Sequence, residues 1–168
     1  TRQCWGMDLS AFYSLMAVTC FTLVGLWWTV VEKHPEWKVA GRSRKLAGGV
    51  YLSFLLPGLM STFAQVDPSN PLLWRVSFGV TSLVGLVATL GIVRVDRTGV
   101  RGPFRRCRWL VALLYVLVLV LGVFPGVAGL IGLTALQAAS LALIGLIVLG
   151  HGLAWEFMME PEPDQATT

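Results

Sequence analysis

Residues 109–155 read WLVALLYVLVLVLGVFPGVAGLIGLTALQAASLALIGLIVLGHGLAW, which is 47 consecutive residues without Asp, Glu, Lys or Arg. The hydrocarbon layer of a bilayer is about 30 Å thick, and about 20 helical residues cross it. A single helix of this length would extend about 70 Å, so the stretch predicts two crossings joined by a turn. Pro125 and Gly126, followed by Gly129 and Gly132, are its only cluster of helix breakers and mark the predicted turn.

The whole chain has the composition of a membrane protein. Its 168 residues are 55% hydrophobic and 13% charged, whereas a typical soluble domain has about 25% charged residues. A soluble fold of this size could not bury so many Leu, Val and Phe side chains. We therefore expect an all-α polytopic bundle in one transmembrane domain (1–157) with a disordered acidic tail (158–168). The predicted spans are 9–31, 46–66, 72–93, 109–124 and 133–157.

The basic residues predict the orientation of these spans. Eleven of the 13 Lys and Arg residues lie in two loops, five between Lys33 and Lys45 and six between Arg94 and Arg108. Loops rich in Lys and Arg stay on the cytoplasmic side. We expect the N-terminus outside, the C-terminus inside, and the protein in the plasma (inner) membrane. The same distribution makes the net charge of +4 a topology signal and argues against a nucleic-acid partner.

Small and weakly polar residues recur at helical spacing on several spans. In lipid, such residues mark the faces on which helices pack. The fourth span has few of them, so we expect it to face lipid most, while the first span carries Ser10, Ser14, Thr19, Thr22 and Thr29. The lines that are candidates for either helix packing or a narrow polar path are Gly49, Ser53, Pro57, Ser61 and Gln65 in the second span, Ser77, Thr81, Gly85 and Thr89 in the third, and Gln137, Ser140 and His151 in the fifth.

Pro57 lies in the middle of the second span and has no N–H to donate to the carbonyl of Ser53. We expect a kink there, with Gly58 adding local freedom. The kink fits either packing within the protein or a hinge of the kind that transporters use.

The sequence offers few groups for chemistry. No Asp, Glu, Lys or Arg lies deep in a predicted span, and His151 is the one strongly titratable candidate there, as a packing histidine or as a proton relay. We expect no catalytic residue, no cofactor and no metal site, because His34 and His151 lack a cluster of further ligands. Cys4, Cys20 and Cys107 are expected to be free thiols.

Three functions remain open. The first is a non-catalytic membrane protein that acts through helix packing, as a homo-oligomer or as a subunit of a larger membrane complex. The second is a small channel or facilitator with a path between the second and third spans, and the third is a membrane enzyme, for which no catalytic constellation is found. Besides the bilayer and other membrane subunits, anionic lipids are candidate partners for Arg105, Arg106 and Arg108.

Overall fold

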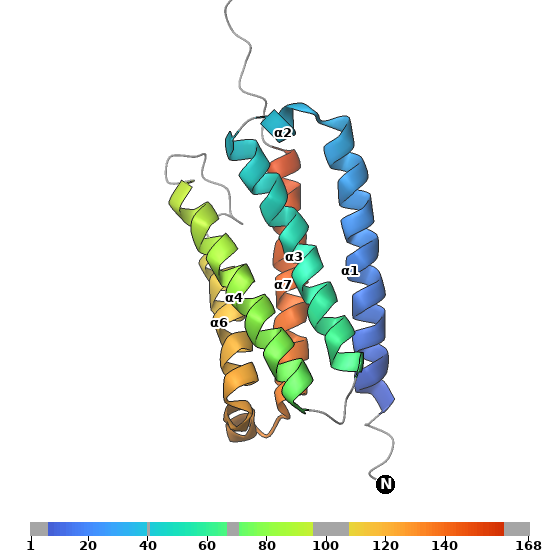
Figure 1. Ribbon diagram of the computed structural model, residues 1–168, viewed down its shortest axis with the longest axis vertical. Helices are drawn as coiled ribbons and strands as arrows, with labels where there is room; N and C mark the ends of the chain where they lie inside the picture. Colours follow the sequence, from blue (N-terminus) through green and yellow to red (C-terminus); the bar gives the residue numbers. More distant parts are fainter. Residues whose placement is uncertain (1–6, 40, 67–70, 96–107, 160–168) are drawn as a thin grey trace, which may run out of the picture.

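The computed structural model describes residues 7–39, 41–66, 71–95 and 108–159, and these residues are helical almost throughout (Figure 1). Four helices, over Leu9–Lys33, Ser43–Val66, Leu72–Arg94 and Ala135–Met158, are long and apolar enough to cross a membrane. The described part of the chain contains no strand, in agreement with the all-α prediction. In order, the elements are α1 (Met7–Lys33), α2 (Glu36–Val39), α3 (Gly41–Val66), α4 (Pro71–Val95), α6 (Arg108–Val123), the 3₁₀ helix η1 (Pro125–Ile131) and α7 (Ala135–Met158).

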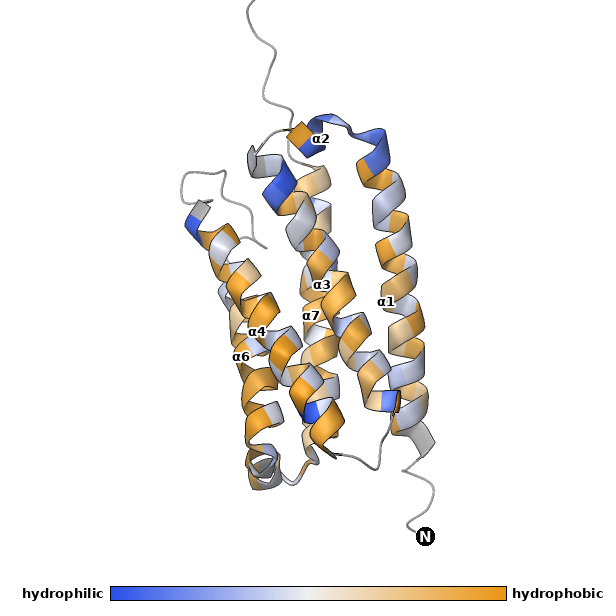
Figure 2. Cartoon of the chain, viewed as in Figure 1, coloured by the Kyte–Doolittle hydropathy of each residue, from blue (hydrophilic) through white to orange (hydrophobic). Residues whose placement is uncertain are grey.

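The long helices run up and down beside one another, with α3 in contact with α1, α2, α4 and α7 (Figure 1). Helix α6 packs against α4 and α7. Apolar residues cover the lengths of the helices, and hydrophilic residues gather near the ends, above all where α1, α2 and α3 meet (Figure 2). We call this the basic end, because Lys33, Lys38, Arg44 and Lys45 lie there.

The predicted break in the long apolar stretch is confirmed. Helix α6 ends at Val123, and η1 begins at Pro125. Proline is well tolerated at the first position of a helix, because the N–H that it lacks would have no partner within the helix. The turn closes at Gly132, whose φ of +71° lies in the left-handed region that glycine adopts without strain. The next helix begins at Ala135 rather than at 133 because Thr134 caps it, accepting from the backbone N–H of Gln137.

The expectation that the fourth span faces lipid most is wrong. Six of the 16 residues of α6 are buried, against α4 and α7. The window of α1 that is apolar enough to span is only 17% buried, the lowest share among the four candidate spans. Leu and Val look the same in a sequence whether lipid or another helix covers them, so their abundance in α6 did not reveal its neighbours.

The helices approach one another at glycines. A Cβ atom added to Gly58 on α3 would lie 2.9 Å from Cβ of Cys20 on α1, and one added to Gly150 on α7 would lie 2.6 Å from Oγ of Ser53 on α3. Between α4 and α6, a Cβ on Gly85 would overlap the ring of Tyr115. Because lipid tails are as apolar as side chains, helices in a membrane associate by such close packing rather than by the hydrophobic effect.

Arg75 links the start of α4 to the end of α6. Its guanidinium donates from Nε to the carbonyl of Gly122 at 2.9 Å and from Nη2 to that of Val123 at 2.8 Å. The last four carbonyls of a helix have no donor within the helix. A cation at this end also interacts favourably with the negative end of the helix dipole. In the structure Arg75 therefore caps the end of α6.

We predict that Gly85→Ala destabilises the bundle, because the new methyl group must displace the buried ring of Tyr115. Overpacking of this kind costs about 1–3 kcal/mol. The measurement is thermal unfolding of the purified protein in a mild detergent. Gly79→Ala on the same helix is the matched control, since nothing lies within 4 Å of its added Cβ. Equal melting temperatures for the two variants would show that the contact at Gly85 does not matter for stability.

Candidate functional site

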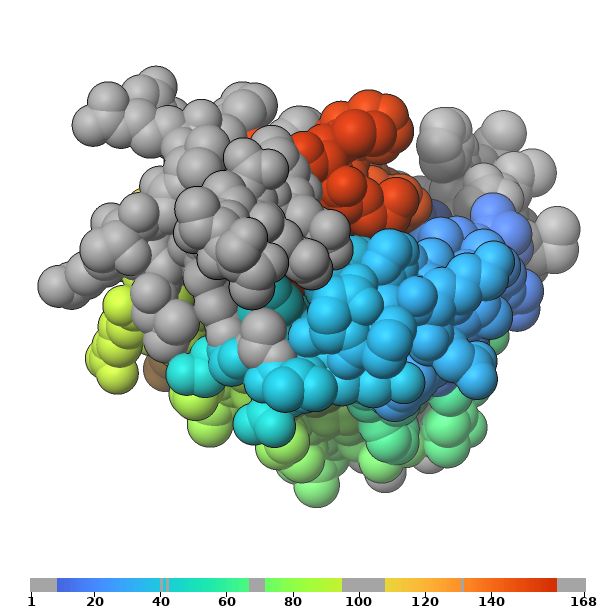
Figure 3. Space-filling view, turned by 90° about the horizontal axis from the view of Figure 1, so that it is seen from above, coloured from blue at the N-terminus to red at the C-terminus, as the bar shows by residue number. Residues whose placement is uncertain are grey.

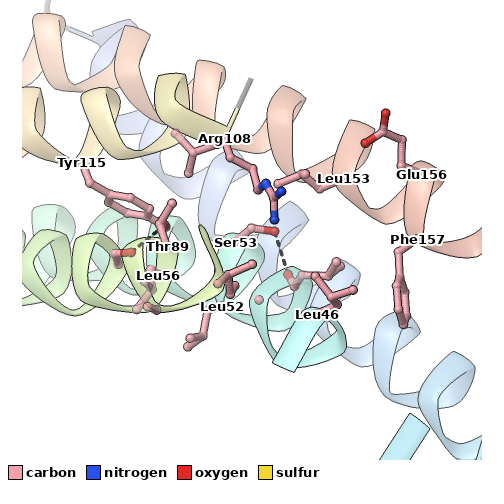
Figure 4. A pocket seen from close by; sticks show the side chains of 16 residues that line it. Leu46, Leu52, Ser53, Leu56, Thr89, Arg108, Tyr115, Leu153, Glu156 and Phe157 are labelled. Carbon is pink, nitrogen blue, oxygen red and sulfur yellow. Dashed lines mark hydrogen bonds between the residues drawn. The ribbon is translucent and has the colours of Figure 1, made fainter. Parts of the chain in front are cut away.

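A small cavity lies between α3, α4, α6 and α7 and is the best candidate for a functional site. It lies toward the basic end, where α3 and α6 begin and α4 and α7 end (Figure 4). Its volume is about 70 Å³. One water needs about 10–15 Å³ of such space, so the cavity has room for a few waters or a solute of similar size.

Small residues of α3 and α4 contribute to the wall of the cavity. Gly49 and Ser53 of α3 line it together with Gly85 and Thr89 of α4. A side chain at Gly49 would meet Ile92, another lining residue, with its Cβ only 2.5 Å from Cδ1 of that side chain. The two glycines thus let Ile92 of α4 and Tyr115 of α6 pack closely against their neighbours at the wall of the cavity.

The hydroxyl groups of the cavity bond to their own helices. Ser53 donates to the carbonyl of Val50 at 2.7 Å, and Thr89 donates to that of Gly85 at 2.7 Å. Such back-bonding satisfies the donor of a hydroxyl inside a membrane helix and leaves its oxygen able to accept a further bond. The two hydroxyls therefore offer acceptor sites at the cavity wall.

Two of the described residues that line the cavity are charged. Figure 4 shows the guanidinium of Arg108, at the start of α6, directed inward beside Ser53 and Leu153. Glu156 of α7 also lines the cavity. Tyr115 of α6 forms part of the opposite wall, where it packs over Gly85.

The remaining stripe residues of α3 and α4 continue the interior below the cavity. Pro57 and Ser61 are fully buried on α3, and Thr81 is buried on α4. Thr81 donates to the carbonyl of Ser77 at 2.6 Å, and the amide of Gln65 donates to that of Ser61 at 3.0 Å. Helix α3 continues through Pro57 as one helix.

Two buried hydroxyls in this region make no hydrogen bond to the described residues, namely those of Ser61 and Ser82. Ser82, which the sequence reading had not singled out, is on α4 beside Thr81 and has no exposed surface. A buried hydroxyl without a partner costs about 1–3 kcal/mol, so these two oxygens stand out as polar groups inside an apolar bundle.

The candidate residues of α7 lie outside the cavity. Gln137 forms a capping box with Thr134, and Ser140 donates to the carbonyl of Gln137 at 2.8 Å. His151 is exposed, with Nδ1 at 2.9 Å from the carbonyl oxygen of Ile147 and its ring edge-to-face with Phe54. The structure therefore does not bring these three residues to the stripes of α3 and α4.

Several sequence predictions concern residues that the structure does not describe. Arg105 and Arg106, Cys4 and Cys107, and the tail from residue 160 lie outside the described residues. Cys20 is a buried free thiol, as expected. Among the described residues, no group of three or more His, Cys, Asp or Glu could hold a metal ion.

The site residues that sequence reasoning missed are Tyr115, Ser82 and Glu156. The first two are isolated polar residues in apolar helices, and periodicity alone did not distinguish them from packing residues. Comparisons of the chain with protein-family models, curated proteins and solved structures found no match. The function must therefore be argued from the residues and their geometry.

Proposed function

We propose that this chain is a five-span, non-catalytic integral membrane protein that acts by helix packing, as a homo-oligomer or as a subunit of a larger membrane complex. The observation that carries the proposal is the outer face of α1. There Ser14, Val18, Thr22, Gly25 and Thr29 follow one another at intervals of three or four residues, and all five are exposed.

This face differs from the stripes of α3 and α4, whose glycines pack inside the chain. Nothing lies within 4 Å of a Cβ added to Gly25. Thr22 and Thr29 donate to carbonyls of their own helix, at 2.8 and 2.7 Å, so neither hydroxyl is used in a contact with another helix. Small residues and Ser or Thr at helical spacing are the surface on which membrane helices associate, and α1 leaves this surface to a partner.

The five-span arrangement is supported by the position of α6. Its 16 residues extend about 24 Å, which is short for a hydrocarbon layer of about 30 Å. However, α6 packs along α4, and its last carbonyls meet Arg75 near the start of α4. In this proposal α6 crosses most of the same layer as α4, and η1 completes the crossing.

The orientation follows from the basic end, which we place in the cytoplasm. A cysteine introduced by Ser43→Cys should resist a membrane-impermeant maleimide in intact cells and react after permeabilisation. Asn70→Cys, in the loop between α3 and α4, should react in intact cells and is the matched control. Cys4 and Cys107 are first replaced by Ser, whereas the buried Cys20 stays. Labelling of Ser43→Cys in intact cells would reverse the proposed orientation.

The association is tested by the mass of the protein in lipid nanodiscs, where a single chain has 18.3 kDa. We expect the wild-type chain to be an oligomer or to co-purify with a membrane partner, and Gly25→Leu to release it as a single chain. Gly91→Leu is the matched control, because Gly91 is also exposed with open space around its Cβ position, and it should leave the assembly intact. A wild-type chain that is monomeric and without a partner contradicts the proposal.

A second candidate function is a small facilitator with a path between α3 and α4. The buried hydroxyls of Ser61 and Ser82, below a water-sized cavity, are the observation that favours it. The few-water volume of the cavity limits the solute to water or a molecule of similar size. In this proposal a water molecule enters through the cavity and then forms hydrogen bonds with the two hydroxyls as it passes between the helices.

The water permeability of liposomes that contain the chain shows whether Ser61 and Ser82 conduct water or only pack between helices. If the hydroxyls carry the path, Ser61→Ala and Ser82→Ala should each slow water flux about fivefold, the effect of one lost hydrogen bond of about 1 kcal/mol. If they only pack, each variant should raise thermal stability without changing flux. Ser140→Ala, outside the cavity, is the control. Wild-type liposomes no more permeable than empty ones would exclude the facilitator.

A further inference from the structure

A second hollow, larger than the four-helix cavity, lies between α1, α2 and α3 at the basic end. We call it the aromatic groove, because Trp27, Trp28, Trp37 and Tyr51 form its walls. Its volume is about 420 Å³, which falls within the range of about 300–1,000 Å³ for ligand pockets. None of the stripe residues of α3 and α4 lines it.

The walls of the groove are held in place by ring contacts and one buried hydrogen bond. The indole N–H of Trp27 donates to the carbonyl of Ala47 at 3.1 Å, which joins α1 to α3. Trp28 and Tyr51 meet edge-to-face with ring centroids 5.7 Å apart. Trp37 stacks on Trp27 at 6.1 Å. Because three elements are fixed to one another in this way, the groove is a formed feature of the fold.

Helix α7 supports the groove from behind. Phe157, in its last turn, packs against Trp37 with ring centroids 4.5 Å apart. Figure 3, the view from above, shows the end of α7 in red beside the blue and cyan segments of α1, α2 and α3. The aromatic cluster thus ties the connection between α1 and α3 to the body of the bundle.

The charge of the groove is positive. Among the described residues that line it, two are charged, namely Lys38 in the last turn of α2 and Arg44 near the start of α3. Two acidic residues are next to lining residues in sequence, Glu32 and Glu36, and neither lines the groove. Oε1 of Glu36 lies 2.7 Å from Nδ1 of His34. A hydrogen bond from its own backbone N–H, and then the neighbouring His34, lower the pKa of the Glu36 carboxyl. The two lining cations, Lys38 and Arg44, are the feature that favours an anionic group in the groove.

The rest of the groove is apolar. Val31, Ala47 and Gly48 line it between the aromatic side chains, and nothing lies within 4 Å of a Cβ added to Gly48. Trp28 is 56% exposed although it lies in a span that is apolar enough to cross a membrane. Trp and Tyr favour the boundary between hydrocarbon and headgroups, so the groove lies at the depth where a lipid changes from chain to phosphate.

We propose that the aromatic groove binds an anionic phospholipid. Its phosphate lies between Lys38 and Arg44, where charge-assisted hydrogen bonds are available. Its glycerol and the upper part of one acyl chain lie over Gly48, against the ring pair of Trp28 and Tyr51. A free phosphate ion would use the two cations and leave the apolar part empty, so the shape of the groove favours the lipid. The inference rests on membrane insertion, and it depends on neither the oligomeric state nor the orientation.

The test is lipid binding by the detergent-purified full chain, measured by native mass spectrometry. The probes are phosphatidylglycerol, phosphatidylcholine as a lipid without net charge, and inorganic phosphate as an anion without a chain. We expect one tight phosphatidylglycerol site in the wild-type chain. The double variant Lys38→Gln/Arg44→Gln should weaken it about thirtyfold, as expected for the loss of two direct hydrogen bonds to the phosphate of about 1 kcal/mol each.

A matched control separates a site from general attraction to the basic end. Lys33→Gln/Lys45→Gln removes the same charge from exposed residues at the same end that do not line the groove, and it should keep the site. Gly48→Leu fills the groove without changing charge and should also abolish tight binding. Equal weakening by both charge pairs, wild-type binding by Gly48→Leu, equal affinity for phosphatidylcholine, or displacement by inorganic phosphate would each overturn the proposal. Melting temperatures of all variants establish that they are folded.

Discussion

Close approach of helix backbones is the constraint on which the rest of this structure depends. Each main contact has a position with little or no side chain, such as Gly58 against Cys20 between α1 and α3, or Gly150 against Ser53 between α3 and α7. In water, larger apolar residues would be favoured at these positions because their burial stabilises a fold. In lipid that gain is nearly absent, so the helices are held by dense packing.

The same constraint separates the two kinds of small-residue stripe. On α3 and α4 the small residues are used inside the chain, where Gly49, Ser53, Gly85 and Thr89 line the four-helix cavity. On α1 the corresponding residues are exposed. The stripes look alike in the sequence, but those of α3 and α4 pack inside the chain, whereas that of α1 is exposed. Only the positions of the neighbouring helices distinguish them.

Much of the fold was predictable from the sequence, and the errors have identifiable causes. The turn at Pro125 was predicted because proline and the glycines after it interrupt a helix whatever surrounds them. The lipid exposure of α6 was predicted wrongly, because branched aliphatic residues suit both lipid and a neighbouring helix. Gln137 was assigned to a polar stripe, although its spacing from Thr134 fits a capping box, which the structure contains.

The candidate sites were less predictable than the helices. Gly49, Ser53, Gly85 and Thr89 were found by their periodicity and do line one cavity. Its aromatic wall was missed, since a single Tyr115 in an apolar helix carries no spacing signal. The aromatic groove was missed for a related reason, because its walls come from three elements and its cations look like ordinary loop charges.

The contact of Arg75 with the end of α6 has a consequence for the order in which the chain is assembled. The two acceptors follow the arginine by 47 and 48 residues, so a ribosome completes α4 long before they exist. Until then the guanidinium has neither carbonyl available, and from its place near the start of α4 it can meet only water or lipid headgroups. The two hydrogen bonds of Arg75 can therefore form only after the end of α6 has been made and has come to lie beside the start of α4.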